Sequence, residues 1–405
     1  MGSKNRQKTK NKMEMISFEE AYKTVMAASF SMGTETVPFD VSLGRILAQD
    51  VKSDMDMPPF DKSTVDGFAC RRSDLGSELE IIETIPAGKQ PLKMSGEGEC
   101  SRIMTGAPLP QGADCVIMVE DSLILSSGKM KFMGEYSKPN ISPKGEDIRN
   151  GELVLGTGKQ ITPQDIAVMA MVGCTTLSVS KMPVVGVISS GDELVEPSIK
   201  PDVSQIRNSN GYQILAQVQR AGGTGKYYGI ARDDEQATYE IVAKAISECN
   251  IVLITGGVSM GDFDFVPSVL EKAGVKMIFS RVNVQPGKPT TFGIHQRCLV
   301  FGLPGNPVSS FIQFELLVRP LIFRMMGSIW SPVTMELPMQ ESYTRRSSER
   351  LGLIPVIITE ARQVLPVEYH GSAHILSMSV AHGIITIPVG RSIINKGELV
   401  SVRQI

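Results

Sequence analysis

Residues 251–257 read IVLITGG, and this stretch decides the fold class of the central part of the chain. An unbroken run of apolar and β-branched residues is typical of a strand that is buried on both faces of a parallel sheet. The two glycines that follow predict a tight loop at the carboxyl end of the strand. A second run of the same kind, VVGVIS, occupies residues 184–189.

Helical and strand-like segments alternate around these two runs. Helices are predicted over 210–222, 235–249, 265–274 and 308–327, and further strands over 227–234, 276–284 and 298–303. Such alternation predicts a doubly wound α/β domain over residues 183–328.

The rest of the chain is richer in strands. Ser17 and Glu20 form the predicted capping box of a helix over 17–29, and a Thr-Pro pair at Thr162 starts a second short helix. Short strand-like pieces between Pro- and Gly-rich turns predict a β-rich segment that ends at Asp147. After Pro332, alternating strands predict a small β-barrel or sandwich.

Composition and charge argue against several classes of protein. The chain has 405 residues and a net charge of −2, so it lacks the overall field that attracts nucleic acid or an anionic membrane. No segment approaches the ~20 apolar residues of a membrane span. Six widely spaced cysteines without a CxxC pair, and only four histidines, argue against structural zinc and disulfides. Residues 1–14 are polar and predict a disordered leader rather than a signal peptide, so a cytoplasmic protein with reduced thiols is expected.

Candidate ligand-binding residues follow the predicted strands of the α/β domain, because ligands of open α/β sheets bind beyond the carboxyl ends of the strands. Four loops should therefore gather at one edge of the sheet. Their candidate residues are Asp192, Glu193, Asp233, Thr255, Gly256, Gly257, Ser259, Gly261, Asp264, Pro304, Gly305, Asn306 and Pro307.

The chemistry of these loops leaves alternatives open. The segment TGGVSMGD (255–262) is neither a Walker loop nor a GxGxxG motif, so it is either a phosphate cradle or a tight structural turn. The acids could hold Mg²⁺, or they could be helix N-caps and solvated loop residues. Lys288 in QPGKP is either a partner of an anionic ligand or a solvated turn residue.

Nine motifs in this order resemble the molybdopterin molybdotransferases, the family that includes the E domain of gephyrin. The resemblance runs from about Met15 to the end of the chain. The motifs are PPFDKSTVDGFA (58–69), RIMTGAPLP (102–110), KGEDI (144–148), SSGDEL (189–194), RNSNGY (207–212), ARDD (231–234), TGGVSMGDFDFV (255–266), QPGKPTTFG (285–293) and FGLPGNPVSSF (301–311).

The resemblance implies a multidomain fold. It consists of an elongated, discontinuous N-terminal module (15–54 and 148–182), a β-rich insert (55–147), an α/β domain similar to molybdopterin adenylyltransferase (183–328) and a C-terminal β-barrel (329–405). It also implies a homodimer in which the partner's N-terminal β-rich module lines the active-site cleft. The resemblance also suggests molybdopterin adenylyltransferase and molybdoenzyme chaperones as partners.

The implied reaction starts from adenylylated molybdopterin and molybdate, takes the metal up at the dithiolene, hydrolyses the phosphoanhydride and releases AMP. Glu193, Asp233 and Asp264 would hold Mg²⁺. Asp66 would position substrate or water, and Thr105 would donate a hydrogen bond. Asn208 and Asp192 would contact substrate, whereas Lys288, Arg350 and Ser372 would bind molybdate or the pterin phosphate.

One position departs from the family pattern. Some relatives carry lysine where this chain has Gln285, so a second cation is missing unless Arg350 or another side chain compensates. Tungstate as the natural cargo, an adenylyltransferase and a non-catalytic scaffold remain the competing hypotheses. The retained acids, together with the N-terminal motifs and the C-terminal segment, favour the molybdotransferase.

Overall fold

The computed structural model describes residues 15–257, 266–367 and 374–405. The predicted leader and the predicted site residues Ser259, Gly261, Asp264 and Ser372 lie outside these ranges. The described chain forms two compact units. The first comprises the described parts of Met1–Glu35, Gly44–Ala48 and Ser178–Ile405, and the second comprises Thr36–Leu43 and Gln49–Leu177.

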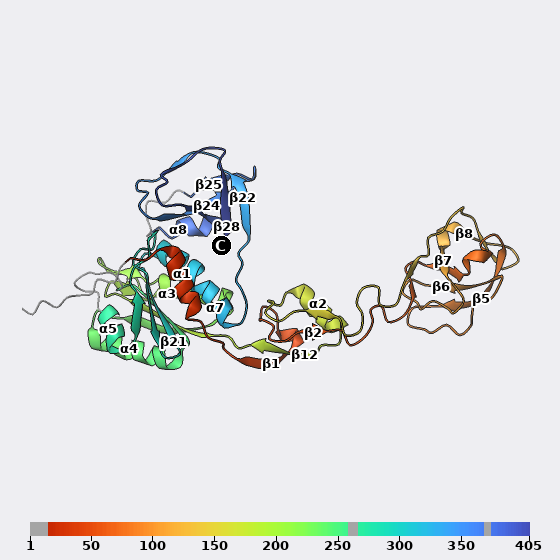
Figure 1. The fold of residues 1–405 in the computed structure, drawn as a ribbon, viewed down its shortest axis with the longest axis horizontal. Coiled ribbons are helices and arrows are strands. Elements are labelled where there is room, and N and C mark those ends of the chain that lie inside the picture. The colour runs from red at the N-terminus through yellow and green to blue at the C-terminus, as the bar shows by residue number, and fades with distance from the viewer. Residues whose placement is uncertain (1–14, 258–265, 368–373) are drawn as a thin grey trace, which may run out of the picture. The chain divides into compact units, whose positions relative to one another are not determined.

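A six-stranded sheet forms the centre of the first unit (Figure 1). Its order is β16 (Thr224–Ala231), β13 (Val184–Ser190), β17 (Ile251–Thr255), β21 (Cys298–Leu303), β20 (Thr291–His295) and β18 (Lys276–Phe279). The first four strands are parallel, and β20 pairs antiparallel with both β21 and β18.

Helices cover both faces of this sheet, which confirms the predicted doubly wound fold. One core cluster joins the sheet to α1 (Phe18–Ala27), α3 (Asn210–Arg220), α6 (Pro307–Gln313) and α7 (Arg319–Met325). A second cluster joins the opposite face to α4 (Glu235–Glu248) and α5 (Val266–Lys272). Strand side chains alternate between the two clusters, as in Leu253 and Ile254, because successive residues of a strand point to opposite faces.

Two predicted elements are wrong in detail. The strand predicted over 276–284 ends at Phe279, and Val284–Gln285 forms β19, which pairs with β24 (Leu351–Ile358) in another sheet. The helix predicted over 308–327 contains a π-helical segment, η4 (Phe314–Val318), between α6 and α7. Pro320 explains this segment, because proline donates no backbone hydrogen bond and its ring crowds the carbonyl four residues earlier.

The C-terminal part of the first unit is a mainly antiparallel sheet in the order β19, β24, β26 (Gly383–Ile387), β28 (Leu399–Gln404) and β22 (Thr334–Pro338). β25 (Val364–Pro366) also pairs with β24. The remaining elements of the unit are the pair β14 (Leu194–Val195) and β15 (Ile206–Arg207), the pair β23 (Tyr343–Thr344) and β27 (Ile393–Ile394), and α8 (Leu376–Val380).

The second unit contains the β-rich sheet predicted from the turn pattern. Its strand order is β7 (Cys115–Met118), β4 (Gly67–Cys70), β6 (Glu99–Ile103), β5 (Glu78–Ile85), β9 (Met130–Phe132) and β8 (Ser122–Ile124). β2 (Val51–Lys52) pairs with β11 (Leu153–Leu155), so chain segments on both sides of this sheet lie side by side. This pairing makes the N-terminal module discontinuous, as the family resemblance implied.

The smaller elements of this part of the chain complete the description. They are β3 (Lys62–Ser63), which pairs with β10 (Ile141–Ser142), α2 (Pro163–Met171), and the short helices η1 (Phe39–Val41), η2 (Arg72–Asp74) and η3 (Val119–Asp121). β1 (Thr34–Pro38) and β12 (Thr176–Ser180) contain residues at which the two units divide.

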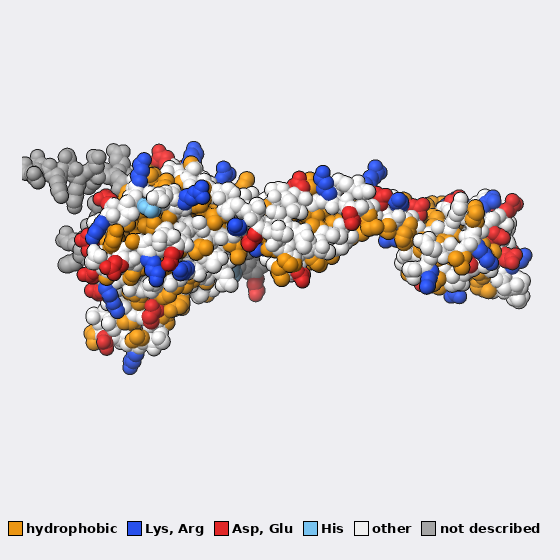
Figure 2. All heavy atoms as spheres, turned by 90° about the horizontal axis from the view of Figure 1, so that it is seen from below, with side chains coloured by type: hydrophobic (Ala, Val, Ile, Leu, Met, Phe, Trp, Pro, Cys, Tyr) orange, Lys and Arg blue, Asp and Glu red, His pale blue; other side chains and the backbone are white. Residues whose placement is uncertain are grey.

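On the face shown in Figure 2, acidic and basic side chains alternate with apolar ones rather than gathering by sign. Among the described residues, no helix is long and apolar enough to cross a membrane.

Candidate functional site

Four loops begin in one row at the carboxyl edge of the central sheet. Ser190 at the end of β13 pairs with Ala231 of β16, and Ser189 pairs with Thr255 at the end of β17. Thr255 in turn pairs with Leu303 at the end of β21. The loops after these four strands therefore start side by side, as the sequence predicted.

The loop after β17 needs glycine. Gly256 and Gly257 have φ values of +91° and +62°, a region that favours glycine. A Cβ atom on Gly256 would lie 2.3 Å from the backbone oxygen of Ser190. The backbone of the loop thus packs directly against the end of β13.

Thr255 ties this loop to its neighbour. Its hydroxyl donates to the backbone oxygen of Pro304 over 3.1 Å, and the Gly256 N–H donates to the Leu303 oxygen over 3.3 Å. The backbone at Pro304 and Gly305 therefore lies directly against the glycine loop. Asn306 directly precedes α6 as its N-cap residue.

The acidic loops are joined by backbone contacts. The Asp233 N–H donates to Oδ1 of Asp192 over 3.1 Å, and Nη1 of Arg232 donates to the Asp192 carbonyl over 3.2 Å. Glu193 folds back over Gly191, since a Cβ there would lie 2.4 Å from its Oε2. Asp192, Glu193 and Asp233 are exposed.

Asp234 has a structural role instead. Its carboxylate accepts from the Ala237 N–H over 2.7 Å and so caps α4. Here the alternative of a helix N-cap applies.

The exposed carboxylates could serve as ligands in an open magnesium site, but they do not form a closed metal site made of protein ligands alone. Among the described residues, no three Cys, His, Asp or Glu side chains come together as metal ligands. Mg²⁺ needs only one or two carboxylates when phosphate oxygens and waters complete its shell. Glu193 and Asp233 offer hard oxygen ligands of this kind.

Asn208, a predicted substrate ligand, is fully used inside the protein. Its Oδ1 accepts from the Ser189 hydroxyl over 3.0 Å and from the Gly211 N–H over 3.1 Å. Its Nδ2 donates to the Tyr227 hydroxyl over 2.6 Å. The side chain is 2% exposed, so the structure favours a role in holding α3 against β13.

Sequence reasoning passed over Asn210 in the same motif. Its Nδ2 donates to Oγ1 of Thr255 over 2.9 Å and to the Gly305 oxygen over 2.7 Å. It thus connects α3 with two of the loops at the sheet edge. The available signal was its place as a polar residue at the start of a predicted helix.

Arg350 contacts the strand that leads into the QPGKP turn. Pairing of β19 with β24 sets Gln285 opposite Gly352, and Nη1 of Arg350 donates to the Val284 oxygen over 3.4 Å. Arg350 therefore lies beside the turn that carries Lys288. Whether Arg350 takes the place of the lysine that Gln285 replaces stays a prediction.

Two residues in the helix-sheet interior fix this turn. The Thr290 hydroxyl donates to the Gly287 oxygen over 2.7 Å, and Nε2 of Gln313 donates to the Pro286 oxygen over 3.4 Å. Gly287 has a φ of +109°, and a Cβ there would lie 2.3 Å from Gln313 Nε2. The turn is therefore held tightly against α6.

Asp66 and Thr105 form a contact within the second unit. The Thr105 N–H and hydroxyl each donate to Oδ1 of Asp66 over 2.7 Å. Both bonds hold the pKa of Asp66 below its usual value, and the backbone bond has the larger effect. The carboxylate is exposed and remains charged at neutral pH.

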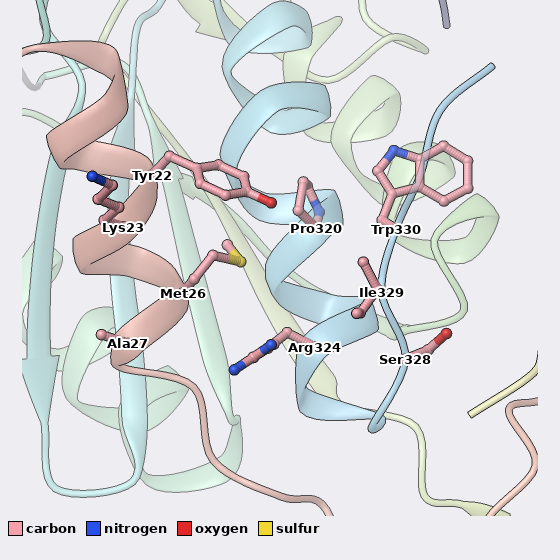
Figure 3. A pocket seen from close by; sticks show the side chains of 9 residues that line it. All are labelled: Tyr22, Lys23, Met26, Ala27, Pro320, Arg324, Ser328, Ile329 and Trp330. Atoms are coloured by element: carbon pink, nitrogen blue, oxygen red, sulfur yellow. The ribbon is translucent and has the colours of Figure 1, made fainter. Parts of the chain in front are cut away.

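Other features lie apart from these residues. A pocket of about 370 Å³ lies between α1 and α7, with Tyr22, Met26, Pro320, Arg324 and Trp330 in its walls (Figure 3). None of the predicted site residues that the structure describes lines it.

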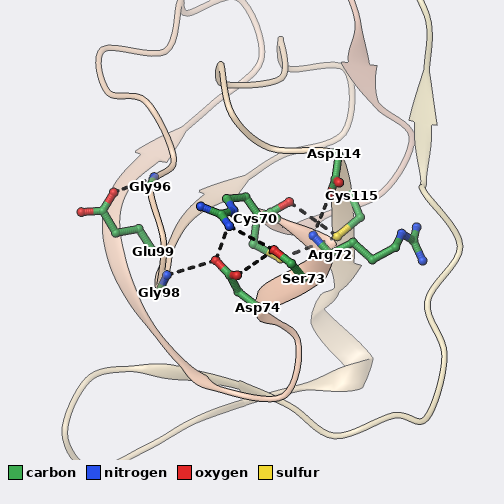
Figure 4. A network of polar contacts seen from close by, with 10 residues as sticks. Cys70, Arg72, Ser73, Asp74, Gly96, Gly98, Glu99, Asp114 and Cys115 are labelled. Atoms are coloured by element: carbon green, nitrogen blue, oxygen red, sulfur yellow. Dashed lines mark hydrogen bonds and ion pairs between the residues drawn. The ribbon is translucent and has the colours of Figure 1, made fainter.

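The cysteines are free thiols, as expected. The Sγ atoms of Cys70 and Cys115 lie 3.7 Å apart on neighbouring strands, close to the hydrogen bond from the Arg72 N–H to Asp114 (Figure 4). Burial raises the pKa of Cys100 to about 12. These thiols are therefore packing residues of the β-rich sheet.

Comparisons with known proteins cover nearly the whole chain. Family models match for the MoeA N-terminal region (domain I and II) over residues 16–173, a probable molybdopterin binding domain over 186–324 and the MoeA C-terminal region (domain IV) over 338–405. A molybdopterin molybdenumtransferase of Staphylococcus epidermidis is 34% identical over 96% of this chain and 95% of its own length. The chain belongs to the MoeA family. The predicted family and the transferase class are thereby confirmed.

Further members of the MoeA family agree. The molybdopterin molybdenumtransferase of Staphylococcus aureus (strain Mu50) is 34% identical, with 96% of each chain covered. A crystal structure of the molybdopterin biosynthesis moeA protein from Pyrococcus horikoshii OT3 has a TM-score of 0.84 and 30% identity. It covers 97% of this chain and 100% of that one.

Proposed function

We propose that this protein is a molybdopterin molybdotransferase of molybdenum-cofactor biosynthesis. It would insert molybdenum from molybdate into adenylylated molybdopterin, hydrolyse the phosphoanhydride and release AMP. The observation that carries the proposal is the side-by-side start of the glycine loop and the acidic loops at one sheet edge. Relatives named as molybdopterin molybdenumtransferases over nearly the full chain support it.

The glycine loop is the proposed phosphate site. Its two glycines have backbone conformations that favour glycine, and backbone N–H groups near glycines bind phosphate oxygens. The Thr255 hydroxyl is already engaged with Pro304, so it shapes the loop. Gly305 brings a second stretch of backbone to the same place.

Magnesium is the proposed metal. Glu193 and Asp233 would hold it, with Asp264 as a further candidate outside the described residues. When bound, the ion neutralises the charge that develops on the phosphoanhydride. The contact between Asp192 and the Asp233 N–H keeps the two acidic loops at a fixed separation.

Lys288 and Arg350 are the proposed partners of the molybdate or tungstate oxyanion, because guanidinium and ammonium groups bind anions through charge-assisted hydrogen bonds. The contacts of Gln313 and Thr290 with the QPGKP turn hold Lys288's backbone in place. Ser372 remains a candidate outside the described residues.

We also propose a homodimer in which Asp66 and Thr105 of a second subunit complete the site. The carboxylate of Asp66 is exposed, and Thr105 holds it charged and fixed in direction. A fixed carboxylate can orient substrate or a water molecule.

The experiment measures AMP release from adenylylated molybdopterin with Mg²⁺, alone and with molybdate or tungstate. Wild-type protein should release AMP faster with oxyanion, and Glu193→Gln should lose at least about tenfold in rate, as expected for a lost metal ligand. Glu271→Gln, an exposed acid on α5, is the matched control and should retain wild-type rates.

Each outcome decides between the competing functions. Stimulation by tungstate alone would make tungsten the cargo. Tight substrate binding with no AMP release under any condition would exclude the transferase and favour a carrier or scaffold.

A further inference from the structure

Arg345 carries a buried positive charge in the C-terminal part of the first unit. The residue directly follows β23 and is 8% exposed. Its Nη2 donates to the Arg350 backbone oxygen over 2.5 Å, and its Nη1 donates to the Ile387 oxygen over 3.4 Å. Both partners are neutral carbonyl groups, so neither of them cancels the charge.

No counter-ion for this charge stands among the residues that the structure describes. The titratable groups whose charges act on Arg345 are Tyr343 and Arg350, and no carboxylate is among them. Burial lowers the pKa of Arg345, and the charge of Arg350 lowers it further, but a guanidinium stays protonated at neutral pH. Buried charges in proteins are usually paired, as Arg391 is with Glu398 at the surface of the same unit. An unpaired one is therefore unusual.

A glycine makes room for the guanidinium at a defined place. A Cβ on Gly352 would lie 2.4 Å from Nη1 of Arg345, so the guanidinium fills the space of a side chain at this position. Gly352 of β24 is the register partner of Gln285 of β19. Register partners point to the same face of a sheet, and neighbouring strands lie about 4.8 Å apart. The charge of Arg345 therefore lies one strand away from Gln285, on the face to which the Gln285 side chain points.

Arg345 also fixes the start of the Arg350 side chain. It holds the carbonyl group of Arg350, whose own Nη1 donates to the Val284 oxygen over 3.4 Å. Arg350 is partly exposed, so it can meet a ligand that Arg345 cannot touch.

We propose that Arg345 is a positioning residue of the oxyanion site, which holds the backbone of Arg350 and supplies a second positive charge beside Gln285. The inference deepens the proposed function and rests on its assignment of the oxyanion to Arg350. The charge of Arg345 acts through space, because an unpaired charge in a poorly solvated place attracts an anion over several ångströms. Molybdate and tungstate are dianions, which such a charge attracts about twice as strongly as a monoanion.

The proposal also gives the neutral side chain at position 285 a physical reason. A lysine there would face the Arg345 guanidinium from the neighbouring strand, and like charges directly opposite each other are destabilising. The positive charge should therefore be exchangeable between the two positions.

The test exchanges this charge and measures molybdate binding to the full-length protein by calorimetry. Arg345→Met removes the charge but fills most of the same space, and it should weaken binding roughly tenfold. Adding Gln285→Lys to Arg345→Met should restore the affinity to within about threefold of wild type, whereas adding Gln285→Met should not.

Controls separate charge from packing. Arg345→Lys keeps the charge and loses the guanidinium hydrogen bonds, so it should lose less affinity than Arg345→Met. Arg391→Met removes an arginine that is already paired with Glu398, and it should bind molybdate like wild type. Thermal unfolding verifies that each variant is folded.

Wild-type affinity in Arg345→Met, or a loss that Gln285→Lys fails to restore in folded protein, would overturn the inference while leaving the proposed function standing. The inference also fails if wild-type protein binds no molybdate. If oxyanion-stimulated AMP release is then absent as well, the proposed function fails with it.

Discussion

At the scale of single residues, Asp66 shows how one neighbour sets the charge of a candidate catalytic group. Thr105 donates both its N–H and its hydroxyl to the same oxygen of Asp66. Both bonds favour the carboxylate over the acid, which lowers the pKa.

Thr105→Val should raise the pKa of Asp66 but leave it below its usual value, because the backbone bond remains. The measurement is a carbon-13 NMR titration of the Asp66 carboxyl. The Thr157 N–H and hydroxyl likewise donate to Asp50, each over 2.9 Å. Thr157→Val is therefore the matched control, and it should leave the pKa of Asp66 unchanged. An Asp66 pKa that does not move in Thr105→Val would contradict the account.

Gly256 tests the close approach of the glycine loop. Gly256→Ala meets both a positive φ and the Ser190 oxygen, whereas Gly229→Ala meets a positive φ of +88° with open space around its Cβ. Backbone strain alone costs about 1–3 kcal/mol. Denaturant unfolding should show that Gly256→Ala loses clearly more stability than Gly229→Ala, and equal losses would mean that the contact with Ser190 is unimportant.

At the scale of elements, α2 depends on a buried acid at its start. Asp165 accepts from the Thr162 N–H and hydroxyl and pairs with Lys159 at 3.1 Å. Burial raises the pKa of Asp165, but these bonds together outweigh burial and lower it. A lowered folded-state pKa means that the carboxylate stabilises the fold above its unfolded-state pKa, and that this contribution is lost as the pH falls through the folded-state value.

Asp165→Asn should therefore lose stability most strongly at neutral pH, and its deficit against wild type should shrink below about pH 4, the unfolded-state pKa of aspartate. Urea unfolding across this range measures the difference. Asp147→Asn, an exposed acid in the same unit, should show little deficit at any pH. A deficit for Asp165→Asn that stays constant down to low pH would contradict the assignment.

At the scale of the whole molecule, the proposed dimer predicts complementation between two defective chains. Asp66→Asn and Glu193→Gln chains should each be inactive alone. After mixing with subunit exchange, random pairing gives heterodimers with one intact site, so about a quarter of wild-type AMP release should return. No recovery, despite exchange shown by mass spectrometry, would place both residues in the site of a single chain.

Much of the fold could be predicted from local patterns. The runs at 184–189 and 251–257 are buried strands, and the Ser17 capping box is present. The division of 276–284 between two sheets could not be predicted, because strand pairing with β24 depends on residues far along the chain. The π-helical segment had a local signal in Pro320, which a 3.6-residue pattern ignores.

The sequence predicts where the candidate site lies better than it predicts the role of each side chain in it. Topology alone brings the loops after β13, β16, β17 and β21 to one edge. The role of Asn208 could not be predicted, because its internal bonds to Ser189 and Tyr227 leave no trace in the RNSNGY motif. The contact of Arg350 with Val284 depends on the β19–β24 pairing, which joins residues far apart in the sequence.

The most direct test of the central claim is the stoichiometry of transfer. Purified protein is incubated with adenylylated molybdopterin, Mg²⁺ and molybdate, and both the AMP released and the molybdenum bound to the dithiolene product are quantified. The account predicts equal amounts of the two, rising together with time and both lost in Glu193→Gln. AMP release without molybdenum in the product would contradict it, because the protein would then be a hydrolase rather than a molybdenum transferase.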